Sequence, residues 1–170
     1  MSAAGNRRIV LVGMMGSGKT TVGRVLASRL RCDLLDTDAV VEAREGRTVR
    51  DIFAADGEEA FREIESEVLS ELLSRPGASV IAAAGGVVLR QQNRDALRAS
   101  GARVVWLSAD PGMLADRVKG GVHRPLLDGD PEGTLRRMYE QREALYREVA
   151  DVIVTVDGRS VTDVVDAVLR

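Results

Sequence analysis

The segment Gly13–Thr20 combines glycines, a lysine and a threonine at a spacing that can hold phosphate groups. It matches the pattern G-x-x-x-x-G-K-[ST], in which the glycines let consecutive backbone N–H groups point at phosphate oxygens. Lys19 is placed to reach the β- and γ-phosphates of a nucleotide, and the Thr20 hydroxyl is placed to coordinate Mg²⁺. An ordinary glycine-rich turn is the alternative, but the motif stands between an apolar run and a helical pattern, as a phosphate loop requires.

This motif indicates a bound nucleotide without indicating what receives the phosphate, because kinases, GTPases, motor ATPases and regulators all share it. We expect the loop and the residue after it to bind the nucleotide through Gly13, Gly16, Ser17, Gly18, Lys19, Thr20 and Thr21. The acceptor has to be identified from other parts of the chain.

Two carboxylates, Asp36 and Asp38, follow a short apolar run and are candidates for acid–base and metal chemistry. Residues two apart on an extended segment project to the same side. One carboxylate can then support hydrated Mg²⁺, while the other accepts a hydrogen bond and a proton from an attacking hydroxyl. The alternative is that Asp38 only caps a helix over residues 39–44.

Arg62 and Ala84-Gly85-Gly86 are further candidates for contact with a ligand. Arg62 lies beside the apolar stripe of an amphipathic helix predicted over residues 58–73, and a solvated pair with Glu58 is the alternative. The two glycines follow a predicted strand, where missing side chains let a ligand approach the backbone, unless the segment is simply a tight turn.

A segment rich in glycine and proline over residues 119–132 predicts a functional lid in the middle of the chain. Arg124 in this segment can close over the γ-phosphate as charge develops in the transition state, or it is an ordinary surface residue. His123, just before it, matches no chemistry and is interpreted as a variable lid residue.

The elements that must position these groups alternate between strand and helix. Helical stripes cover residues 21–30 and 58–73, and apolar runs of β-branched character cover residues 9–12, 33–35, 79–83, 103–107 and 152–156. This alternation predicts an α/β fold, a three-layer α/β/α sandwich with a parallel, five-stranded sheet. Ligands of such sheets bind beyond the carboxyl ends of the strands, so we expect the site in the strand-to-helix loops.

Length and composition limit the class of protein. The chain has 170 residues, 45% of them hydrophobic, and no repeat or linker, which predicts a single domain over residues 1–170. A net charge of -2 gives no basic field for nucleic acid or an anionic membrane, and no apolar run reaches the roughly 18 residues of a membrane span. Arg7 and Arg8 before an apolar run make a poor secretory signal, and one cysteine gives no internal disulfide, so we expect a cytoplasmic protein.

Taken in order, these motifs resemble the shikimate kinase family, a branch of the nucleoside monophosphate kinase-like P-loop enzymes. The resemblance covers about residues 8–170 and rests on a series of motifs rather than on any one of them. The series consists of Gly13 to Thr20, Asp36-Thr37-Asp38, Phe61-Arg62 with Glu65, Gly85-Gly86, Arg117, Arg124-Pro125-Leu126-Leu127 and Arg142 before Leu145-Tyr146.

The resemblance implies transfer of the ATP γ-phosphate to the 3-hydroxyl of shikimate, giving shikimate 3-phosphate and ADP, in the biosynthesis of chorismate and aromatic amino acids. It implies that Asp38 binds the shikimate hydroxyls and aligns or deprotonates the attacked one, while Asp36 supports Mg²⁺ through water. Arg62 and Arg142 would grip the shikimate carboxylate, since guanidinium presents paired donors that match it. Glu65 would hold Arg62 in place.

The resemblance also implies roles around the rest of the site. Lys19, Asp38 and Arg124 would be catalytic, and Arg117 and Arg159 would lie near adenine. Gly85, Gly86, Phe53 and Phe61 would complete the shikimate pocket, although periodicity alone places either phenylalanine equally well in the core. We expect substrate-binding helices over about residues 38–74, a mobile lid over about residues 118–131, and a monomer.

One departure from the family concerns Ala84, because the family commonly has three glycines there. The extra methyl group fits if Ala84 keeps a negative φ angle. The competing hypotheses are a related small-molecule kinase such as a gluconate kinase, an adenylate-type kinase, a non-catalytic shikimate-sensing module and a regulatory NTPase switch. The arginine pair with Asp36-Thr37-Asp38 and the Arg124-Pro125 lid disfavours a gluconate kinase, and a phosphate loop without the proline and Gly-Thr ending disfavours an adenylate-type kinase. A sensing module would usually lack a catalytic group or carry a fused domain, and we expect neither here. A regulatory switch would leave Asp38, Arg62 and Arg142 without a ligand.

Overall fold

A five-stranded parallel sheet forms the centre of the computed structural model, which describes residues 7–118 and 129–170. Its strand order is β2-β3-β1-β4-β5, and every neighbouring pair is parallel. The central strands form where β-branched residues run without interruption, because they are buried on both faces. The strands are β1 (Arg8–Val12), β2 (Asp33–Asp36), β3 (Ser79–Ala82), β4 (Arg103–Ser108) and β5 (Val152–Thr155). The predicted five-stranded parallel sheet is therefore confirmed.

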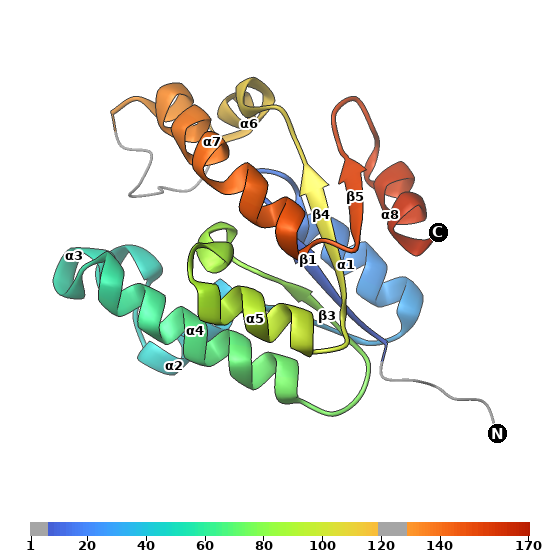
Figure 1. Cartoon of the computed structure of the whole chain (residues 1–170), viewed down its shortest axis with the longest axis horizontal. Helices are drawn as coiled ribbons and strands as arrows, with labels where there is room; N and C mark the ends of the chain where they lie inside the picture. Colours follow the sequence, from blue (N-terminus) through green and yellow to red (C-terminus); the bar gives the residue numbers. More distant parts are fainter. Residues whose placement is uncertain (1–6, 119–128) are drawn as a thin grey trace.

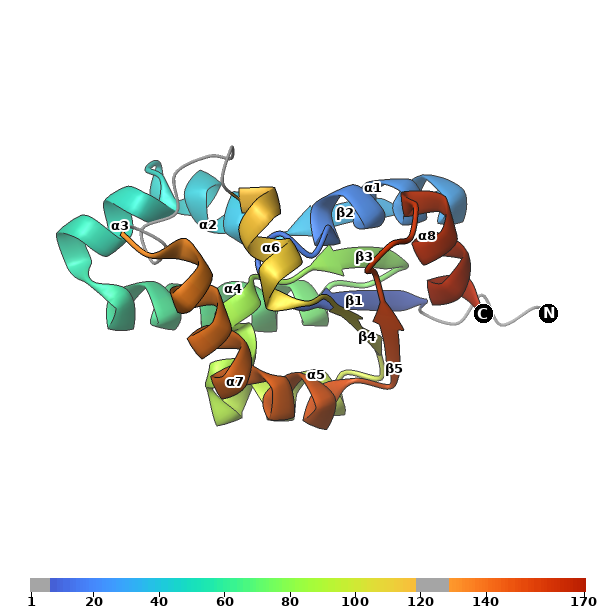
Figure 2. The same cartoon turned by 90° about the horizontal axis from the view of Figure 1, so that it is seen from above.

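Helices cover both faces of this sheet. Helices α1 and α8 lie on one face, and α4, α5 and α7 lie on the other, which gives the predicted three layers (Figures 1 and 2). Shorter helices α2, α3 and α6 lie beyond the carboxyl ends of the strands (Figure 2). The helices are α1 (Lys19–Leu30), α2 (Thr37–Glu45), α3 (Val49–Asp56), α4 (Glu58–Ser74), α5 (Gln91–Ala99), α6 (Pro111–Val118), α7 (Pro131–Val149) and α8 (Val161–Leu169), with a short 3₁₀ helix, η1 (Gly85–Leu89).

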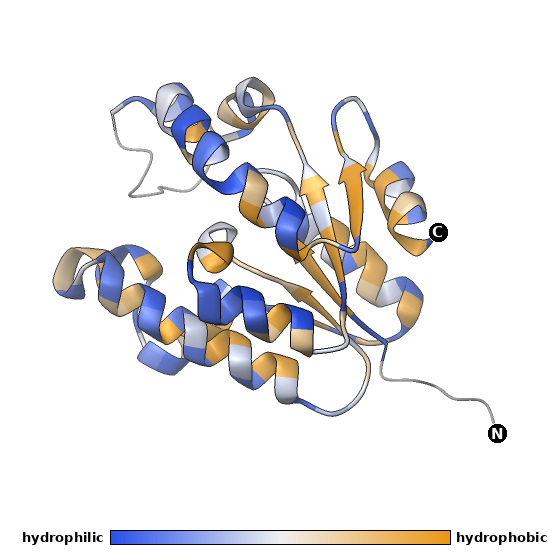
Figure 3. Cartoon of the chain, viewed as in Figure 1, coloured by the Kyte–Doolittle hydropathy of each residue, from blue (hydrophilic) through white to orange (hydrophobic). Residues whose placement is uncertain are grey.

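The apolar core lies between the sheet and the two helical layers. Figure 3 shows largely apolar strands, while the outer faces of the helices are polar. Trp106 of β4, Tyr146 of α7 and Ile52 of α3 are among the largest fully buried side chains. Within the described ranges 7–118 and 129–170, no helix is long and apolar enough to cross a bilayer.

Helix α2 begins earlier than the sequence predicts, and its cap is a different aspartate. The Asp36 carboxylate accepts a hydrogen bond from Ala39 N at 3.2 Å, so Asp36 is the N-cap and the helix starts at Thr37. The alternative that Asp38 is the cap is wrong, because Asp38 already lies in the first turn. Strand β2 ends at Asp36, so the backbone changes from extended to helical between the two carboxylates.

The predicted lid lies between α6 and α7. Val118 ends α6, and Pro131 begins α7 with the Asp130 carboxylate accepting from Gly133 N, which is a common start for a helix. Residues 119–128 lie outside the described residues. The expectations for His123, Arg124 and residues 125–127 fall on that segment and stay predictions.

Candidate active site

The phosphate loop joins β1 to α1, and its glycines have backbone angles that other residues avoid. Gly13, Gly16 and Gly18 all have positive φ, and Gly18 is the N-cap of α1. At Gly13 a side chain is also excluded by space, because a Cβ atom would lie 2.6 Å from the carbonyl oxygen of Leu107. The glycines of the motif are thus required by the loop's geometry, and the loop ends at a helix N-terminus, where anions bind favourably.

Lys19 bends its side chain back over the phosphate loop. Its Nζ atom donates hydrogen bonds to the carbonyl oxygens of Gly13 at 2.7 Å and Met14 at 2.9 Å. These bonds hold the ammonium charge against the loop that would receive the phosphate groups. The loop therefore has the positive charge that a nucleotide site needs.

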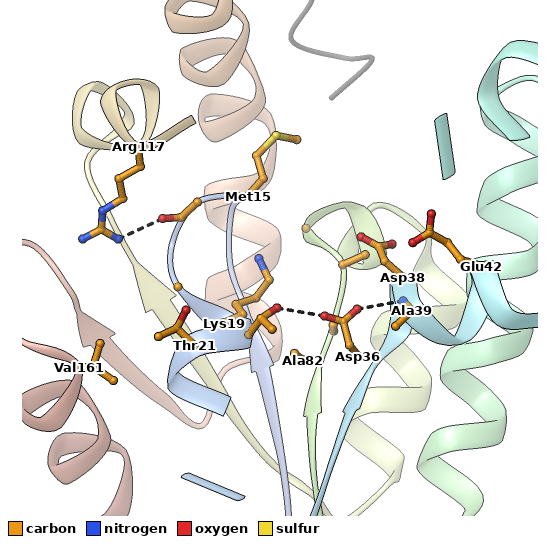
Figure 4. A pocket seen from close by; sticks show the side chains of 16 residues that line it. Met15, Lys19, Thr21, Asp36, Asp38, Ala39, Glu42, Ala82, Arg117 and Val161 are labelled. Carbon is orange, nitrogen blue, oxygen red and sulfur yellow. Dashed lines mark hydrogen bonds between the residues drawn. The ribbon is translucent and has the colours of Figure 1, made fainter. Parts of the chain in front are cut away.

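A cavity of about 600 Å³ opens beside this loop (Figure 4). Lys19 enters it from the loop side, and Asp36 and Asp38 enter it from the end of β2 and the start of α2 (Figure 4). Its lining is Met15, Gly16, Gly18, Lys19, Thr20, Thr21, Asp36, Asp38, Ala39, Glu42, Ala82, Ala83, Ala84, Gly85, Arg117 and Val161. The cavity lies at the carboxyl edge of the sheet, as the sequence predicts.

Thr20 and Asp36, which both line the cavity, are joined by a hydrogen bond. The Thr20 hydroxyl donates to Asp36 Oδ2 at 3.0 Å, which joins the first turn of α1 to the end of β2 (Figure 4). No group of three or more His, Cys, Asp or Glu side chains that could hold a metal occurs in the part of the chain that the structure describes. Mg²⁺ does not need one, because it keeps several waters and binds through one or two protein oxygens plus substrate phosphates. The Thr20–Asp36 pair fits that mode.

Asp36 and Asp38 share the cavity, although not for the reason that the sequence indicates. They do not alternate along one extended segment, since the chain turns from β2 into α2 between them. The turn itself carries both carboxylates into the cavity. Between them, the buried Thr37 hydroxyl accepts a hydrogen bond from Ala84 N at 2.8 Å. This bond fixes the aspartate-bearing turn against the segment after β3.

Arg62 of α4 is buried and paired with Glu65. Arg62 Nη1 lies 3.1 Å from each carboxylate oxygen of Glu65, and Nη2 lies 3.4 Å from Glu58 Oε1. The pair with Glu58 that the alternative predicts is present, but its solvated arginine is wrong, because Arg62 is only 7% exposed. Burial raises the pKa of Glu65, while the neighbouring Arg62 charge lowers it. Glu65 thus fixes the direction in which the Arg62 guanidinium points.

The Gly85-Gly86 turn lies between two buried arginines. A Cβ atom on Gly86 would collide with the Arg62 guanidinium, and one on Gly85 would lie 3.4 Å from Arg142 Nη1. That Gly85 Cβ would also lie 3.2 Å from the Gly13 carbonyl oxygen, so the turn adjoins the phosphate loop. The segment is a 3₁₀ helix rather than an ordinary tight turn, and Ala84 before it keeps a negative φ of -56°. The expectation that the extra methyl group is accommodated is confirmed.

Two of the arginine donors at this turn have no acceptor in the part of the chain that the structure describes. The Nε atoms of Arg62 and Arg142 are buried and lack a hydrogen-bond partner among the described residues. Unsatisfied buried donors are costly, and the contacts of Arg62 with Glu58 and Glu65 leave both of these Nε donors for an acceptor that a ligand supplies. The arrangement is suited to a carboxylate or another planar anion, which accepts paired hydrogen bonds.

The residues expected near adenine are only partly brought together. Arg117 lines the cavity and donates from Nη1 to the Gly16 carbonyl oxygen at 3.0 Å. Arg159 is exposed and lies outside the cavity lining, where the neighbouring Val161 appears instead. Sequence reasoning missed Val161 because it has no distinguishing chemistry.

The two phenylalanines expected to wall the acceptor pocket pack mainly against each other and the core. Their ring centroids lie 4.9 Å apart, Phe61 is 3% exposed, and Phe53 is partly buried against the core. Neither lines the described cavity, nor do Arg62, Gly86 and Arg142, which flank its Gly85 end. The core alternative for Phe61 is therefore favoured, and its contact with an acceptor stays a prediction.

Comparison with known proteins identifies one family. The family model described as "Shikimate kinase" matches residues 15–170. A shikimate kinase from Symbiobacterium thermophilum is 52% identical over 165 residues, which cover 95% of this chain and 94% of that protein. The structure of a shikimate kinase from Acinetobacter baumannii in complex with shikimate has a TM-score of 0.93 at 38% identity, over 98% of this chain and 93% of that one. A gluconokinase from Sinorhizobium meliloti, at 24% identity and a TM-score of 0.63 over 96% and 90% of the two chains, shares the fold alone.

Proposed function

The chain belongs to the shikimate kinase family, and we propose that ATP phosphorylates the 3-hydroxyl of shikimate in the cavity between the phosphate loop and α2. The chain is an ATP-dependent kinase, and its products are shikimate 3-phosphate and ADP. One observation carries the assignment of the acceptor: Arg62 and Arg142, both buried, flank a glycine turn that adjoins the phosphate loop. When the two arginines hold the carboxylate of shikimate, the hydroxyls of the same molecule lie toward the cavity that Asp38 lines.

The nucleotide half of the site holds the phosphates of ATP. Lys19 and the backbone N–H groups of the phosphate loop bind and neutralise the β- and γ-phosphates. Thr20 and Asp36 would hold Mg²⁺ with its waters, and their 3.0 Å contact supports this. The ion supplies positive charge that neutralises the phosphate oxygens during transfer.

The acceptor half binds and aligns shikimate. Arg62 and Arg142 hold its carboxylate through paired hydrogen bonds, and Gly85 offers backbone close to the ring. Asp38 accepts a hydrogen bond from the attacked hydroxyl and points it toward the γ-phosphate. Transfer then proceeds in line, and the protein contributes chiefly positioning and electrostatic stabilisation.

The remaining roles complete the proposal from the sequence. Arg124 would close over the transferring phosphate, so that water is excluded and ATP is not hydrolysed. Arg117, which lines the cavity, and Arg159 would border adenine. We also propose a monomer in the cytoplasm with no nucleic-acid or membrane partner, on the basis of the net charge of -2 and the single cysteine.

The alternatives differ in acceptor, and a coupled ADP-release assay separates them. The assay contains ATP and Mg²⁺ with shikimate, gluconate, a nucleoside monophosphate or no acceptor in parallel. We expect rapid ADP release with shikimate only. Turnover with gluconate instead would indicate a related sugar kinase, and tight shikimate binding without turnover would indicate a sensing module.

A further inference from the structure

Tyr146 of α7 contacts two of the groups to which shikimate binding is assigned. Its hydroxyl donates a hydrogen bond to the Gly85 carbonyl oxygen at 2.6 Å, across 61 positions of the sequence. It also lies beside the guanidinium of Arg142, one turn earlier on the same helix, whose charge lowers the pKa of the hydroxyl. One buried hydroxyl therefore joins the glycine turn to the arginine beside it.

The position of this hydroxyl is fixed by packing around the ring. Tyr146 is fully buried, and its ring stacks on Trp106 with centroids 5.6 Å apart and planes 26° apart. The Arg147 guanidinium lies 5.3 Å from the centroid of the Trp106 ring. A ring held by such contacts cannot move its hydroxyl without disturbing β4 and α7, so the hydrogen bond to Gly85 and the contact with Arg142 have a rigid support.

The bond to Gly85 restrains a peptide that would otherwise have much freedom. Gly85 and Gly86 lack side chains, and glycine has the widest range of backbone conformations. A trans peptide is planar, so holding the Gly85 carbonyl oxygen also sets the direction of Gly86 N–H. Thr37 restrains the residue before this turn, and Asn93 Nδ2 donates to Val87 O at 2.9 Å just after it. The bond from Tyr146 restrains Gly85, which lies between the two residues held by Thr37 and Asn93.

The hydroxyl keeps its proton under all ordinary conditions. Burial raises the pKa of Tyr146 to about 12, although Arg142 lowers it. The group therefore remains a donor to Gly85 and can accept from the Arg142 guanidinium at the same time.

We propose that Tyr146 is a positioning residue for the acceptor: its hydroxyl holds the Gly85 peptide and the Arg142 guanidinium in one arrangement that sets the affinity for shikimate. This inference rests on the proposed function, in which Gly85 and Arg142 bind shikimate. Tyr146 need not touch the substrate, and it acts through both groups.

The variant Tyr146→Phe tests the proposal, because it removes one oxygen and keeps the ring that stacks on Trp106. Tyr139→Phe is a matched control, since it makes the same change on the same helix at the chain's other tyrosine, which is partly buried against the core. Steady-state kinetics give kcat and both KM values, calorimetry gives the Kd of shikimate, and thermal melts check folding.

We expect Tyr146→Phe to raise the KM and Kd for shikimate roughly tenfold, with little change in the KM for ATP, because the bond to Gly85 and the polar contact with Arg142 are lost together. Tyr139→Phe should leave both shikimate constants unchanged. Shikimate constants that stay the same in Tyr146→Phe would overturn the inference. A parallel loss of kcat and of affinity for both substrates would also overturn it, since the hydroxyl would then only support the fold.

Arg142→Ala separates this inference from the proposed function. If Arg142→Ala weakens shikimate binding and Tyr146→Phe does not, Tyr146 has no positioning role, while the acceptor site stands. If Arg142→Ala leaves shikimate binding intact, the acceptor site itself is wrongly assigned. In the double variant, we expect the loss to be smaller than the product of the two single losses, because both changes disturb one linked group.

Discussion

Arg62 Nη1 lies 3.1 Å from both carboxylate oxygens of Glu65, and both side chains are buried. Glu58 also reaches Arg62, at 3.4 Å, but it is half exposed to solvent. The same arginine therefore has one buried and one exposed carboxylate partner on a single helix. This pairing allows the role of the buried partner to be measured against a control within the same structure.

Glu65→Gln should weaken shikimate binding, because it leaves the buried Arg62 without the carboxylate that directs its guanidinium. Burial raises the pKa of Glu65, so an uncharged amide at this position should not cost the fold the full penalty of a broken buried ion pair. We expect the KM for shikimate to rise at least ~10-fold, while the KM for ATP changes little. Glu58→Gln is the control and should cost less than about 1 kcal/mol. Urea unfolding and kinetics check both variants, and equal effects of the two would contradict the assignment.

Ionisation of Glu65 as the pH rises should lower the stability of the fold and strengthen the binding of shikimate. Burial raises the pKa of Glu65 above the ordinary value of 4.5, although Arg62 opposes this. The folded protein therefore binds the proton more tightly than the unfolded chain, and this contribution to stability is present below pH 4.5 and is lost as the pH rises through the raised pKa. In the same pH range Glu65 loses its proton, and the resulting carboxylate orients the Arg62 guanidinium.

From pH 4.5 upward, the unfolding free energy of the original protein relative to Glu65→Gln should therefore fall, while its KM for shikimate should fall as well. Urea unfolding and kinetics at a series of pH values measure the two quantities. A KM for shikimate that has the same pH profile in both proteins would show that Glu65 does not titrate in the acceptor site.

The contact between Thr20 and Asp36 predicts a change in the requirement for Mg²⁺. Asp36→Asn loses the charge but keeps an oxygen that can cap α2, so the thermal midpoint should change little. The Mg²⁺ concentration for half-maximal activity should rise roughly tenfold, as expected when a charged ligand of the ion is removed. Thr20→Val should act in the same direction, and Thr20→Ser, which keeps the hydroxyl, should not. An unchanged Mg²⁺ requirement in Asp36→Asn and Thr20→Val would place the ion elsewhere.

Gly86→Ala should damage the acceptor half through a steric effect on Arg62. The added Cβ would overlap the guanidinium, which must move away from its bond to Glu65. We expect the KM for shikimate to rise at least ~10-fold, because an Arg–carboxylate contact is displaced. Gly101→Ala is the control: its φ of 71° makes alanine strained by roughly 1–2 kcal/mol, but nothing lies within 4 Å. It should lower stability without changing the KM for shikimate, and the same KM change in both variants would contradict the steric explanation.

The parts of the site that could be predicted from the sequence are those carried by short local motifs. The phosphate loop was predicted because the fixed residues of its motif fall within eight consecutive positions, and the strands were predicted because β-branched runs are buried on both faces. Asp36 and Asp38 were placed in the right cavity by the wrong geometry. The sequence does not show that Asp36 caps α2, because that depends on where β2 ends.

Contacts between distant segments could not be predicted. Arg8 looks like an N-terminal surface residue, yet it is 4% exposed and its guanidinium donates to Ser79 Oγ at 3.2 Å and to the Leu73 and Arg75 carbonyls. Tyr146 likewise looks like an ordinary core aromatic until its partner Gly85 is known. In both cases the partners lie more than sixty positions away, and only the folded chain brings them together.

Asp38 gives the most direct test of the account. Asp38→Asn keeps the size of the side chain and removes the carboxylate that is assigned to the attacked hydroxyl. Glu42→Gln is a control, because Glu42 lines the same cavity from the same helix and Gln can still accept the hydrogen bond from Val49 N. The measurement is kcat with shikimate together with the Kd of ATP for the three proteins.

We predict that Asp38→Asn lowers kcat by roughly 10²-fold or more, as loss of a general base or aligning group does, with the Kd of ATP nearly unchanged. Glu42→Gln should keep a kcat close to the original value. Undiminished turnover in Asp38→Asn, with unchanged affinity for ATP and shikimate, would contradict the assignment of this cavity as the place of phosphate transfer to shikimate.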